Sequence, residues 1–383
     1  MEFYRSSVDQ EKYVIATYDM ESAVSLSDAA WNVAIGQSVG NPNVRNAWET
    51  DELFERNSCI ILGDKSYLET IKNGQVKIAF PVINTDWDSD GVSHLLCQLM
   101  GGQMDIDSIL RCRLIDIKLP QCVEDKFLGP RHGISGMRTF TGQFNKPLFG
   151  SIIKPKIGIS PDQLLDMTKQ LVDGGVDFIK EDEILSNPSF CSLEDRVDLI
   201  SNYINNCGRN VVYSFCINSD PHVICDRAKF VSDNGGNGIH INVWCGLGAY
   251  NSVRKMHLDN LNIHFQKSGD KVFTDKSHRF GIDWDVICDL AGLIGVDTIH
   301  SGMWGGYKSD DEDDLRKNLS ILRNRNVVPA LSCGMNADLV APIRERFGCD
   351  WMANVGGAIH GDKDGTTVGA RKIRDAIEIG DSC

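Results

Sequence analysis

The feature that most limits the possible folds of this 383-residue chain is a rhythm that repeats eight times after about Gln143. In each repeat, a short β-branched run ends in polar or glycine residues and is followed by an amphipathic helical stretch. The candidate strands are Phe149–Lys156, Phe178–Glu183, Val211–Asn218, Gly238–Trp244, Leu261–Gln266, Thr298–Gly302, Val327–Gly334 and Trp351–Gly357. Eight such units close a (β/α)₈ barrel, so we expect an α/β fold with a C-terminal TIM barrel.

Local helix signals support this interpretation between the first two strands. Ser160 is a good N-cap, Pro161 occupies the first helical position, and Gly174 and Gly175 end the helix after Val172. The competing architecture is an open doubly wound sheet. It usually has fewer strands and needs a phosphate loop after its first strand, which is not evident here.

Residues 1–140 read differently and predict a separate α+β domain with an antiparallel, ferredoxin-like sheet. The expected strands are Tyr13–Tyr18, Ser58–Gly63 and Gln75–Pro81, and the expected helices are Ser27–Ile35, capped by Ser25 or Ser27, and Ser93–Leu99. The glycine-rich stretch Gly129–Asn145 is the candidate linker. We therefore expect an N-terminal domain over residues 1–140 and a barrel over residues 141–383.

Composition excludes several classes of partner. A formal charge of −14 and a pI of about 5.1 argue against nucleic acid or an anionic membrane, because both require clustered Lys and Arg. No stretch approaches the roughly 18 apolar residues of a membrane helix, and the first residues do not form a signal peptide. The 13 cysteines include no Cys-x-x-Cys pair. We expect reduced thiols and a cytoplasmic protein.

The second candidate strand carries the most informative polar residues. Because successive side chains point to opposite faces, Lys180 and Asp182 share one face, Glu181 points away, and Glu183 lies where the strand opens into a loop. Carboxylate oxygens suit Mg²⁺. An ammonium cannot be a ligand, so Lys180 either forms a plain ion pair or takes up CO₂ to become a carbamate, a third anionic oxygen donor.

Barrel enzymes place their chemistry at the carboxyl ends of the strands, and the first strand ends in two lysines. Lys154 and Lys156 lie two residues apart, on one face of an extended chain, with Pro155 between them. If both face a partly buried mouth, one can lose its proton near neutral pH and abstract a proton beside a carbonyl. The other interpretation is a pair of phosphate anchors or solvated charges.

The last three strand ends offer substrate contacts. His300 ends the sixth strand, and the loop 303–308 after it has the glycine hinges of a lid. Glycine-containing turns follow the seventh and eighth strands, where barrel enzymes commonly bind phosphate through backbone N–H groups. The candidate contacts there are Ser332, Gly334, Gly356 and Gly357.

Four segments together resemble the large subunit of RuBisCO. Ile153-Lys154-Pro155-Lys156, Lys180-Glu181-Asp182-Glu183, Ile299-His300-Ser301-Gly302 and Ser332-Cys333-Gly334 follow one another in that family's order and approximate spacing. The stretch Tyr13–Tyr18 resembles the start of that family's N-terminal domain. The resemblance implies that Lys180 is carbamylated and binds Mg²⁺ with Asp182 and Glu183. It also implies that Lys154 is the enolising base, that Lys156 assists proton transfer, and that the site binds substrate oxygens and phosphate through His264, His300, Ser332, Gly334, Gly356 and Gly357.

Departures from the family pattern lie in the groups that fix CO₂ and bind a second phosphate. The carboxylating lid pattern Gly-Lys-x-Glu-Gly is replaced by Gly306-Tyr307-Lys308-Ser309-Asp310, so the lysine is absent or moved by one residue. The His-Arg pair of the fifth strand becomes His264-Phe265, and Cys333 replaces a glycine. Over the site, the N-terminal domain of the neighbouring subunit normally supplies a glutamate, a threonine and an asparagine. The sequence reads differently in both matching stretches, 35–41 and 101–103.

This combination resembles the non-carboxylating RuBisCO-like proteins. It implies a Mg²⁺-dependent enzyme that forms an enediolate from a phosphorylated keto sugar or keto sugar acid, followed by isomerisation or decarboxylation. The family also implies a homodimer or dimer-based oligomer. Two alternatives remain: a true ribulose-1,5-bisphosphate carboxylase in which Lys308 reaches the site, and a catalytically silent assembly protein.

Overall fold

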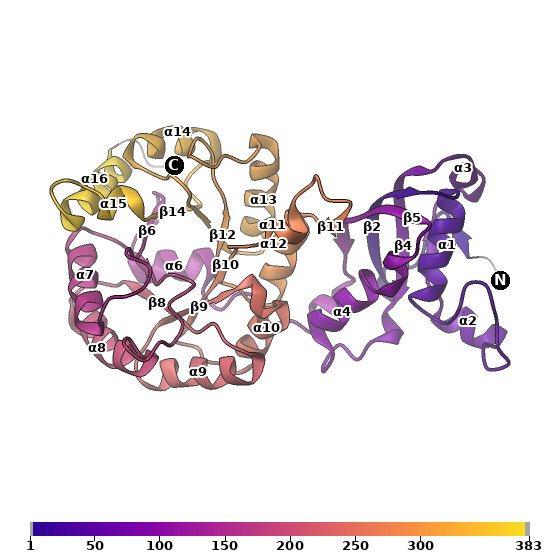
Figure 1. Cartoon of the computed structure of the whole chain (residues 1–383), viewed down its shortest axis with the longest axis horizontal. Helices are drawn as coiled ribbons and strands as arrows, with labels where there is room; N and C mark the ends of the chain where they lie inside the picture. The colour runs from indigo at the N-terminus through magenta and orange to yellow at the C-terminus, as the bar shows by residue number, and fades with distance from the viewer. Residues whose placement is uncertain (1–2, 380–383) are drawn as a thin grey trace. The chain divides into compact units, whose positions relative to one another are not determined.

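The structure is a computed structural model that describes residues 3–379. The chain forms two compact units (Figure 1). The first contains the chain up to Phe127 together with Asp270–Leu290, and the second contains Leu128–Gly269 and the chain from Ala291 onward. The first unit is therefore made of two separate stretches of chain, because residues 270–290 return to it from within the second.

The second unit is a closed barrel of eight parallel strands, which confirms the predicted fold class. Every predicted strand is present, in the order β10-β12-β13-β14-β6-β7-β8-β9 around the barrel. The strands are β6 Leu148–Ile152, β7 Phe178–Lys180, β8 Val212–Cys216, β9 Gly238–Asn242, β10 Asn262–Gln266, β12 Thr298–Gly302, β13 Val328–Leu331 and β14 Met352–Val355. Most are shorter than predicted at their carboxyl ends, where the polar residues belong to loops.

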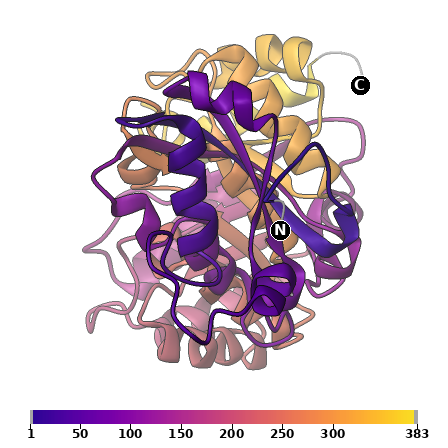
Figure 2. The ribbon, with the colours of Figure 1, turned by 90° about the vertical axis from the view of Figure 1, so that its right-hand side faces the viewer.

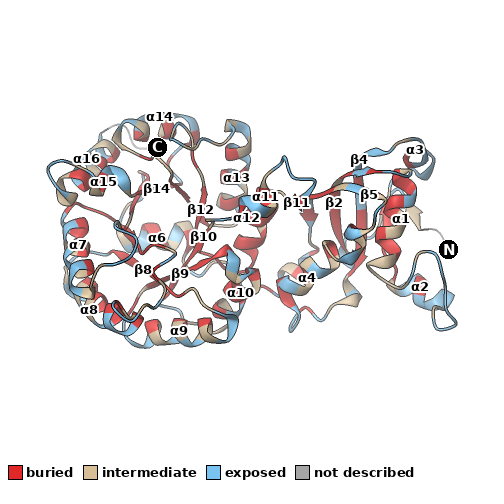
Figure 3. Ribbon diagram, viewed as in Figure 1, coloured by how far each residue is buried: buried red, intermediate tan, exposed pale blue. Residues whose placement is uncertain are grey.

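Helices surround the barrel in Figure 1, and the strands they cover are buried in Figure 3. The longer helices are α7 Pro161–Asp173, α8 Leu193–Asn206, α9 Pro221–Asp233, α10 Leu247–Lys255, α13 Glu312–Asn324, α14 Ala337–Phe347 and α16 Thr366–Glu378, with the short α15 Gly357–His360. Helix α12 Trp284–Leu293 begins in the segment that belongs to the first unit and ends in the second. Helix α7 begins as predicted, because Ser160 and Gln163 form a reciprocal capping box and Pro161 follows the cap.

The predicted linker is wrong, because Gly129–Asn145 contains the helix α6 Gly133–Thr141. Two backbone N–H groups at its start, those of His132 and Gly133, donate to the carboxylate of Asp297 at 2.6 and 3.0 Å. Its Met137 is buried in the barrel core with residues that include Phe178. Two of the glycines that suggested a linker, Gly133 and Gly142, instead mark the boundaries of α6, where φ is positive.

The first unit is built on a six-stranded sheet in the order β1-β3-β4-β2-β5-β11. The strands are β1 Tyr4–Arg5, β2 Tyr13–Ser22, β3 Ile60–Leu62, β4 Asn73–Pro81, β5 Ile109–Lys118 and β11 Phe280–Ile282. The four central strands pair antiparallel, as predicted, while both edge strands pair parallel to their neighbours. Strands β1, β5 and β11 were not predicted.

Strand β11 was missed because three residues carry no periodic signal. It pairs with β5, and Arg113 of β5 is buried with its guanidinium on Asp283 at 2.8 Å and on backbone carbonyls of Thr274 and Asp275. These contacts anchor the returning segment, whereas the sequence suggested a single boundary near residue 140. A segment this short is recognisable only from its partners.

Helices of the first unit are α1 Leu26–Gly36, α2 Asp51–Asn57, α3 Lys65–Thr70, α4 Gly91–Leu99, α5 Gln121–Glu124 and α11 Lys271–Thr274. Of the two predicted caps, Ser25 caps α1, accepting a hydrogen bond from the Asp28 backbone. Helix α1, the indigo helix at the front of Figure 2, packs against β2, β3 and β4. Within the described part of the chain, eleven cysteines have free thiols, while Cys349 is disulfide-bonded, against the expectation of reduced thiols throughout. No helix among residues 3–379 has the length and apolar character needed to cross a membrane.

Candidate active site

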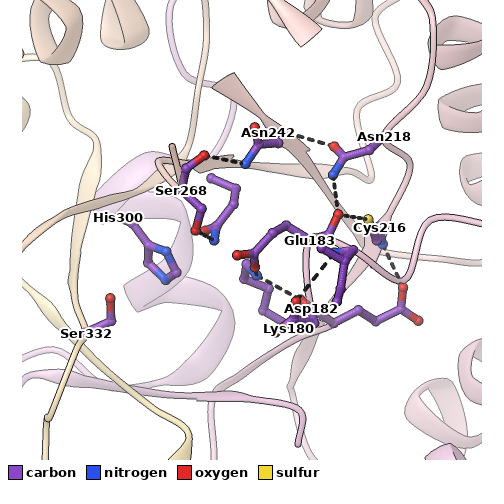
Figure 4. A network of polar contacts seen from close by, with 12 residues as sticks. Lys180, Asp182, Glu183, Cys216, Asn218, Asn242, Ser268, His300 and Ser332 are labelled. Atoms are coloured by element: carbon purple, nitrogen blue, oxygen red, sulfur yellow. Dashed lines mark hydrogen bonds and ion pairs between the residues drawn. The ribbon is translucent and has the colours of Figure 1, made fainter. Parts of the chain in front are cut away.

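Lys180 lies at the carboxyl end of β7, close to Asp182 and Glu183 of the segment that follows it (Figure 4). Its side chain is fully buried, and Nζ donates to the Glu181 carbonyl oxygen at 2.8 Å and to Glu183 Oε2 at 3.4 Å. Burial lowers the pKa of Lys180, and the charges of Glu183 and Asp182 only partly oppose this. The lysine is therefore a buried amine with a reduced tendency to hold a proton.

Asp182 is the link between β7 and the first barrel strand. Its carboxylate is almost fully buried, and Oδ2 accepts a hydrogen bond from Lys154 Nζ at 2.6 Å. Lys154 follows the end of β6 and is about one-third exposed, at 32%. A short charge-assisted bond thus joins the lysine of one strand end to the acid of the next.

Glu183 is held by its backbone and its charge. Its carbonyl oxygen accepts from Asn218 Nδ2 at 2.7 Å, which fixes the loop after β7 to the end of β8 (Figure 4). Burial alone would raise the pKa of Glu183, but the charge of Lys180 and a hydrogen bond from Ser268 outweigh it and hold the pKa at about 2. Glu183 is therefore a carboxylate at neutral pH.

This donor set fits a hard divalent cation if Lys180 contributes. Asp182 and Glu183 supply two neighbouring carboxylates, and among residues 3–379 no cluster of three or more His, Cys, Asp or Glu residues is arranged to hold a metal. A third anionic ligand from the chain would have to come from Lys180, whose amine lies 3.4 Å from Glu183. Because CO₂ reacts with a neutral amine, the lowered pKa of Lys180 suits carbamate formation.

Glu181 points away from this cluster, as the strand alternation predicted. Its Oε1 accepts from Arg196 Nε at 2.8 Å and from the Tyr213 hydroxyl at 3.2 Å, and Oε2 accepts from the Cys216 backbone at 2.7 Å. Glu181 and Arg196 are both fully buried. The Lys-Glu-Asp-Glu segment therefore contributes to two ionic clusters on opposite sides of β7.

Lys156 is placed differently from Lys154. Strand β6 ends at Ile152, so the alternation that would put both lysines on one face does not continue to Lys156, which is exposed. The electrostatic partner of Lys154 is the carboxylate of Asp182. Nothing in the described contacts brings Lys156 to the cluster.

Two predicted histidines meet inside the barrel. The rings of His264 on β10 and His300 on β12 are perpendicular, with centroids 4.7 Å apart. His300 Nε2 lies 2.7 Å from the amide nitrogen of Asn354 on β14. Burial lowers the pKa of His300 to about 3, and the charge of Lys180 acts in the same direction. Burial likewise holds the pKa of His264 well below its ordinary value, so both rings are neutral at pH 7.

Two hydrogen bonds between Met303 and Asp310 join the start and the end of the loop after β12. The backbone N–H of Met303 donates to Asp310 Oδ2 at 2.9 Å, and the Asp310 N–H donates to the Met303 carbonyl at 2.8 Å. At its tip, Tyr307 is 86% exposed, whereas Lys308 is half-buried. A Cβ on Gly334 would lie 2.6 Å from the Tyr307 nitrogen, so this loop lies directly against the turn after β13.

Of the two glycine turns expected to bind anions, the one with Gly334 lies beside this loop and the one with Gly356 lies beside the end of β6. Ser332, nearly buried, faces the same region as His300 in Figure 4. Gly334 has φ of +103°, a conformation that favours glycine. Gly356 precedes the short helix α15, and a Cβ on it would lie 3.5 Å from Lys154 Cε. Gly357 begins that helix and is exposed.

Sequence reasoning missed several polar residues around this site. They are Asn218, Asn242 and Ser268, which support Glu183 and one another, Asn354 beside His300, and Lys267 after β10, whose charge lowers the pKa of His300. Their shared signal is position, because each lies in a barrel strand or follows its carboxyl end. A systematic inspection of every strand end for amides and lysines would have found most of them.

Comparison with known families gives two matches, one to the N-terminal part of the chain and one to the part that contains most of the barrel. Residues 4–123 match the ribulose bisphosphate carboxylase large chain, N-terminal domain, and residues 133–326 match the ribulose bisphosphate carboxylase large chain, catalytic domain. Together they include most of the chain and all of the strand ends from β6 to β12.

Individual relatives include both carboxylases and another enzyme. The chain is 28% identical to ribulose bisphosphate carboxylase of Pyrococcus furiosus, over 99% of this chain and 92% of that protein. It is 31% identical to 3-oxo-isoapionate-4-phosphate decarboxylase of Rhizobium etli, over 78% and 75%. The crystal structure of octameric ribulose-1,5-bisphosphate carboxylase/oxygenase from Pyrococcus horikoshii superposes with a TM-score of 0.89 at 26% identity, covering 98% of this chain and 90% of that one. The chain belongs to the RuBisCO large-chain family.

Proposed function

We propose that this protein is a Mg²⁺-dependent enzyme that forms an enediolate from a phosphorylated keto sugar or keto sugar acid, leading to isomerisation or decarboxylation. One observation carries the proposal: a buried lysine, two adjacent carboxylates and a second lysine converge at neighbouring strand ends. Four ionisable groups gathered in a barrel mouth are costly to bury, and a ligand or reaction that uses them accounts for their presence.

Mg²⁺ would be held by Asp182, Glu183 and the carbamate of Lys180. Bound there, it supplies positive charge to the developing oxygen anions of the substrate. The chain prepares the ligands beforehand, since Asn218 fixes the backbone of Glu183 and Ser268 donates to its carboxylate. Such outer contacts orient metal ligands and strengthen binding.

Lys154 is proposed as the base and acid at substrate carbon, with Lys156 in reserve. Its ammonium, 2.6 Å from Asp182, lies beside the ligand cluster and against Gly356. In isomerisation, Lys154 first gives up its own proton to water, and the neutral amine then takes a proton from the carbon beside the carbonyl and returns it to the neighbouring carbon, while the hydroxyl proton moves to the former carbonyl oxygen. In decarboxylation of a 3-oxo acid, the bond to the carboxylate breaks, CO₂ leaves, the electron pair becomes the enediolate, and the carbon then receives a proton from Lys154.

A single phosphate on the substrate is supported from two sides. The glycine turns around Ser332, Gly334, Gly356 and Gly357 can bind one phosphate through backbone N–H groups. In β10, Phe265 stands where the family pattern has an arginine, and it is buried against Tyr250 of α10 with ring centroids 4.7 Å apart, so this position has no guanidinium to bind a second phosphate. The name of the Rhizobium etli relative likewise describes a substrate with one phosphate and a decarboxylation.

Carboxylation of ribulose 1,5-bisphosphate is the second candidate, favoured by the similarity to pyrococcal carboxylases. It requires a lysine in the lid, and the available residue is Lys308, one position beyond the exposed Tyr307. Radiolabelled CO₂ incorporation into ribulose bisphosphate decides this directly. Incorporation at a rate comparable to proton exchange would replace the enolising isomerase or decarboxylase with a carboxylase.

The central experiment is proton exchange at substrate carbon, followed by NMR in D₂O with Mg²⁺, bicarbonate and a panel of monophosphorylated keto sugars and keto sugar acids. We expect exchange with at least one of them, with loss of CO₂ if that compound is a 3-oxo acid. A parallel titration measures Mg²⁺ binding with and without bicarbonate. Binding that ignores bicarbonate, with no exchange, would favour a silent assembly protein.

Lys180→Ala tests whether Mg²⁺ binding and proton exchange depend on the lysine that is proposed to carry the carbamate. We expect it to abolish bicarbonate-dependent Mg²⁺ binding and to reduce exchange by at least about 100-fold, as for loss of an essential electrostatic group. Lys169→Ala is the matched control, because Lys169 is an exposed lysine of α7 that pairs with Asp166 at 3.4 Å. Unchanged exchange in Lys180→Ala would remove the carbamate from the proposal. We further propose that the protein acts as a homodimer or dimer-based oligomer in the cytoplasm. Sedimentation equilibrium measures the assembly.

A further inference from the structure

Asp182 and Glu183, the two proposed metal ligands, are the first two residues of a tight turn after β7. The backbone N–H of Leu185 donates to the Asp182 carbonyl oxygen at 3.1 Å and closes this turn. The next residue, Ser186, has φ of +37°, a left-handed conformation that is uncommon for residues other than glycine. The chain therefore leaves the turn through a residue whose backbone must be held in place by its surroundings.

Two arginines from neighbouring helices hold Ser186. Arg196 of α8 donates through Nη2 to the Ser186 carbonyl oxygen at 2.6 Å. Arg227 of α9 donates through Nη1 to the Ser186 hydroxyl at 3.1 Å. That hydroxyl donates in turn to the Asn218 carbonyl oxygen at 2.6 Å. Both oxygen atoms of Ser186 thus accept from a guanidinium, which accounts for a serine at a position where glycine would adopt the backbone without strain.

Arg227 also links this turn to the end of β8. Its Nη1 carries two protons and donates to the Asn218 carbonyl oxygen at 2.7 Å as well as to the Ser186 hydroxyl. The side chain of Asn218 returns to the turn, where Nδ2 donates to the Glu183 carbonyl oxygen at 2.7 Å (Figure 4). Asn218 Oδ1 accepts from the backbone N–H of Asn242, which fixes the orientation of the amide. Arg227 is therefore connected to Glu183 through a single residue.

We propose that Arg227 and Ser186 are positioning residues for the metal site, which hold the turn so that Asp182 and Glu183 face one cation. The inference rests on the proposed function. The described hydrogen bonds of Arg227 go to Asn218 and Ser186, so it acts on the carboxylates through these two residues. Contacts of this kind, made outside the ligands themselves, change metal affinity by about 10- to 100-fold.

Calorimetric titration of the full-length protein with Mg²⁺, in the presence of bicarbonate, tests the proposal. Arg227→Met keeps an apolar side chain of similar length and removes the guanidinium, and we expect it to weaken Mg²⁺ binding by about tenfold or more. Lys229→Met is the matched control, because Lys229 is an exposed cation of the same helix that pairs with Asp233 at 2.7 Å. It should leave the affinity unchanged. Equal affinities in Arg227→Met and the unmodified protein would overturn the proposal.

Two substitutions at Ser186 separate positioning from simple stabilisation of the loop. Ser186→Ala and Ser186→Gly both remove the hydroxyl, but only glycine adopts φ of +37° without strain. We expect both to weaken Mg²⁺ binding by about tenfold or more. In denaturant unfolding, Ser186→Gly should be the more stable of the two. If Ser186→Gly keeps the Mg²⁺ affinity of the unmodified protein, the hydroxyl has no positioning role and the proposal fails.

Hydrogen exchange of backbone amides in the metal-free protein keeps this inference distinct from the proposed function. In Arg227→Met, the amide of Leu185 should exchange about tenfold faster because the turn is held less tightly, whereas the amide of Ile179 in β7 should be unaffected. If the unmodified protein binds no Mg²⁺, the proposed function fails, and exchange at Leu185 still decides whether Arg227 holds the turn. Unchanged exchange there would overturn the positioning role in either case.

With an active substrate in hand, the Mg²⁺ dependence of kcat provides a readout that general loss of packing would not move. At low Mg²⁺, Arg227→Met should be slower than the unmodified protein, because fewer sites are filled. At saturating Mg²⁺, its kcat should approach that of the unmodified protein. A deficit that saturating Mg²⁺ does not reduce would overturn the assignment of Arg227 to the metal site.

Discussion

The two sides of strand β7 carry ionic clusters of similar composition and opposite character. On the outer side, Glu181 accepts three hydrogen bonds, from Arg196, Tyr213 and the Cys216 backbone, and both charges are fully buried. On the inner side, Lys180 reaches one carbonyl and, at 3.4 Å, one carboxylate. One cluster has its bonding capacity filled by the protein, and the other does not.

Other buried polar groups in the barrel interior also lack hydrogen-bond partners. Within residues 3–379, buried polar atoms without a partner include both ring nitrogens of His240, Nε2 of His264, the hydroxyl of Ser214 and Oδ1 of Asn354. Native proteins satisfy nearly all buried polar groups, so such a concentration marks where water, substrate or metal completes the structure. The outer pair is therefore interpreted as support, and the inner cluster as the reactive site.

After Lys180→Ala, the largest effect that we expect inside the cluster comes from Lys154→Met. Loss of a general base should slow deuterium exchange by about 10²- to 10⁴-fold. Because Asp182 and Glu183 remain, bicarbonate-dependent Mg²⁺ binding should persist, and it should tighten if the ammonium 2.6 Å from Asp182 competes with the cation. Exchange by NMR and Mg²⁺ titration by calorimetry measure the two properties separately. Exchange within tenfold of the unmodified protein would remove Lys154 as the base.

On the outer side, Glu181→Ala tests whether that cluster is structural. Removing one partner leaves Arg196 charged and buried, which should cost about 3–5 kcal/mol of unfolding free energy. Denaturant unfolding measures it. The matched control is Glu183→Ala at the other end of the same segment, whose side chain is 20% exposed. It should cost less than half as much while abolishing Mg²⁺ binding, and a larger loss for Glu183 would reverse the roles of the two sides.

Sequence alternation was enough to separate the two sides of β7, because β-strand geometry alone sends Lys180 and Glu181 in opposite directions. Alternation could not predict the partners of these residues, which are Arg196 of α8 for Glu181 and Asn218 after β8 for Glu183. These contacts depend on how the successive strands and helices of the barrel pack against one another. For the same reason, Lys156 appeared equivalent to Lys154. Strand β6 ends at Ile152, before either lysine, so alternation does not place them, and it is the contact with Asp182 that distinguishes Lys154 from the exposed Lys156.

At the level of the fold, the eight-unit barrel could be predicted because every strand carries its own apolar run. The helix α6 could not, since its glycines mimic a linker and its identity depends on Asp297 and on Met137 packing into the barrel. The return of residues 270–290 to the first sheet was also invisible. Elements defined by distant partners are the ones that local patterns miss.

The pH dependence of stability should distinguish neutral interior groups from the charged outer pair. Because burial lowers the pKa of His300 to about 3, the unfolded chain binds one more proton than the folded protein between about pH 6.5 and 3. Stability from this group is present above pH 6.5 and falls with decreasing pH by about 1.4 kcal/mol per unit. In denaturant unfolding measured from pH 7 to 4, His300→Gln should reduce the slope by one proton. An unchanged slope would show that His300 is not a buried neutral group in the folded protein.

The smallest effect is expected at Cys333, between the inner site and its lid. With φ of +74°, Cys333 adopts a backbone conformation that costs an ordinary residue about 1–2 kcal/mol and glycine almost nothing. After the greater unfolded-state entropy of glycine is subtracted, Cys333→Gly should stabilise the protein by about 0.5–1 kcal/mol and leave deuterium exchange largely intact. Cys225→Gly, inside helix α9, is the control and should destabilise by about 1 kcal/mol. If both substitutions destabilise equally, the thiol of Cys333 makes a contact with the lid worth more than its backbone strain, and its hydrogen bond to Tyr307 becomes the first candidate.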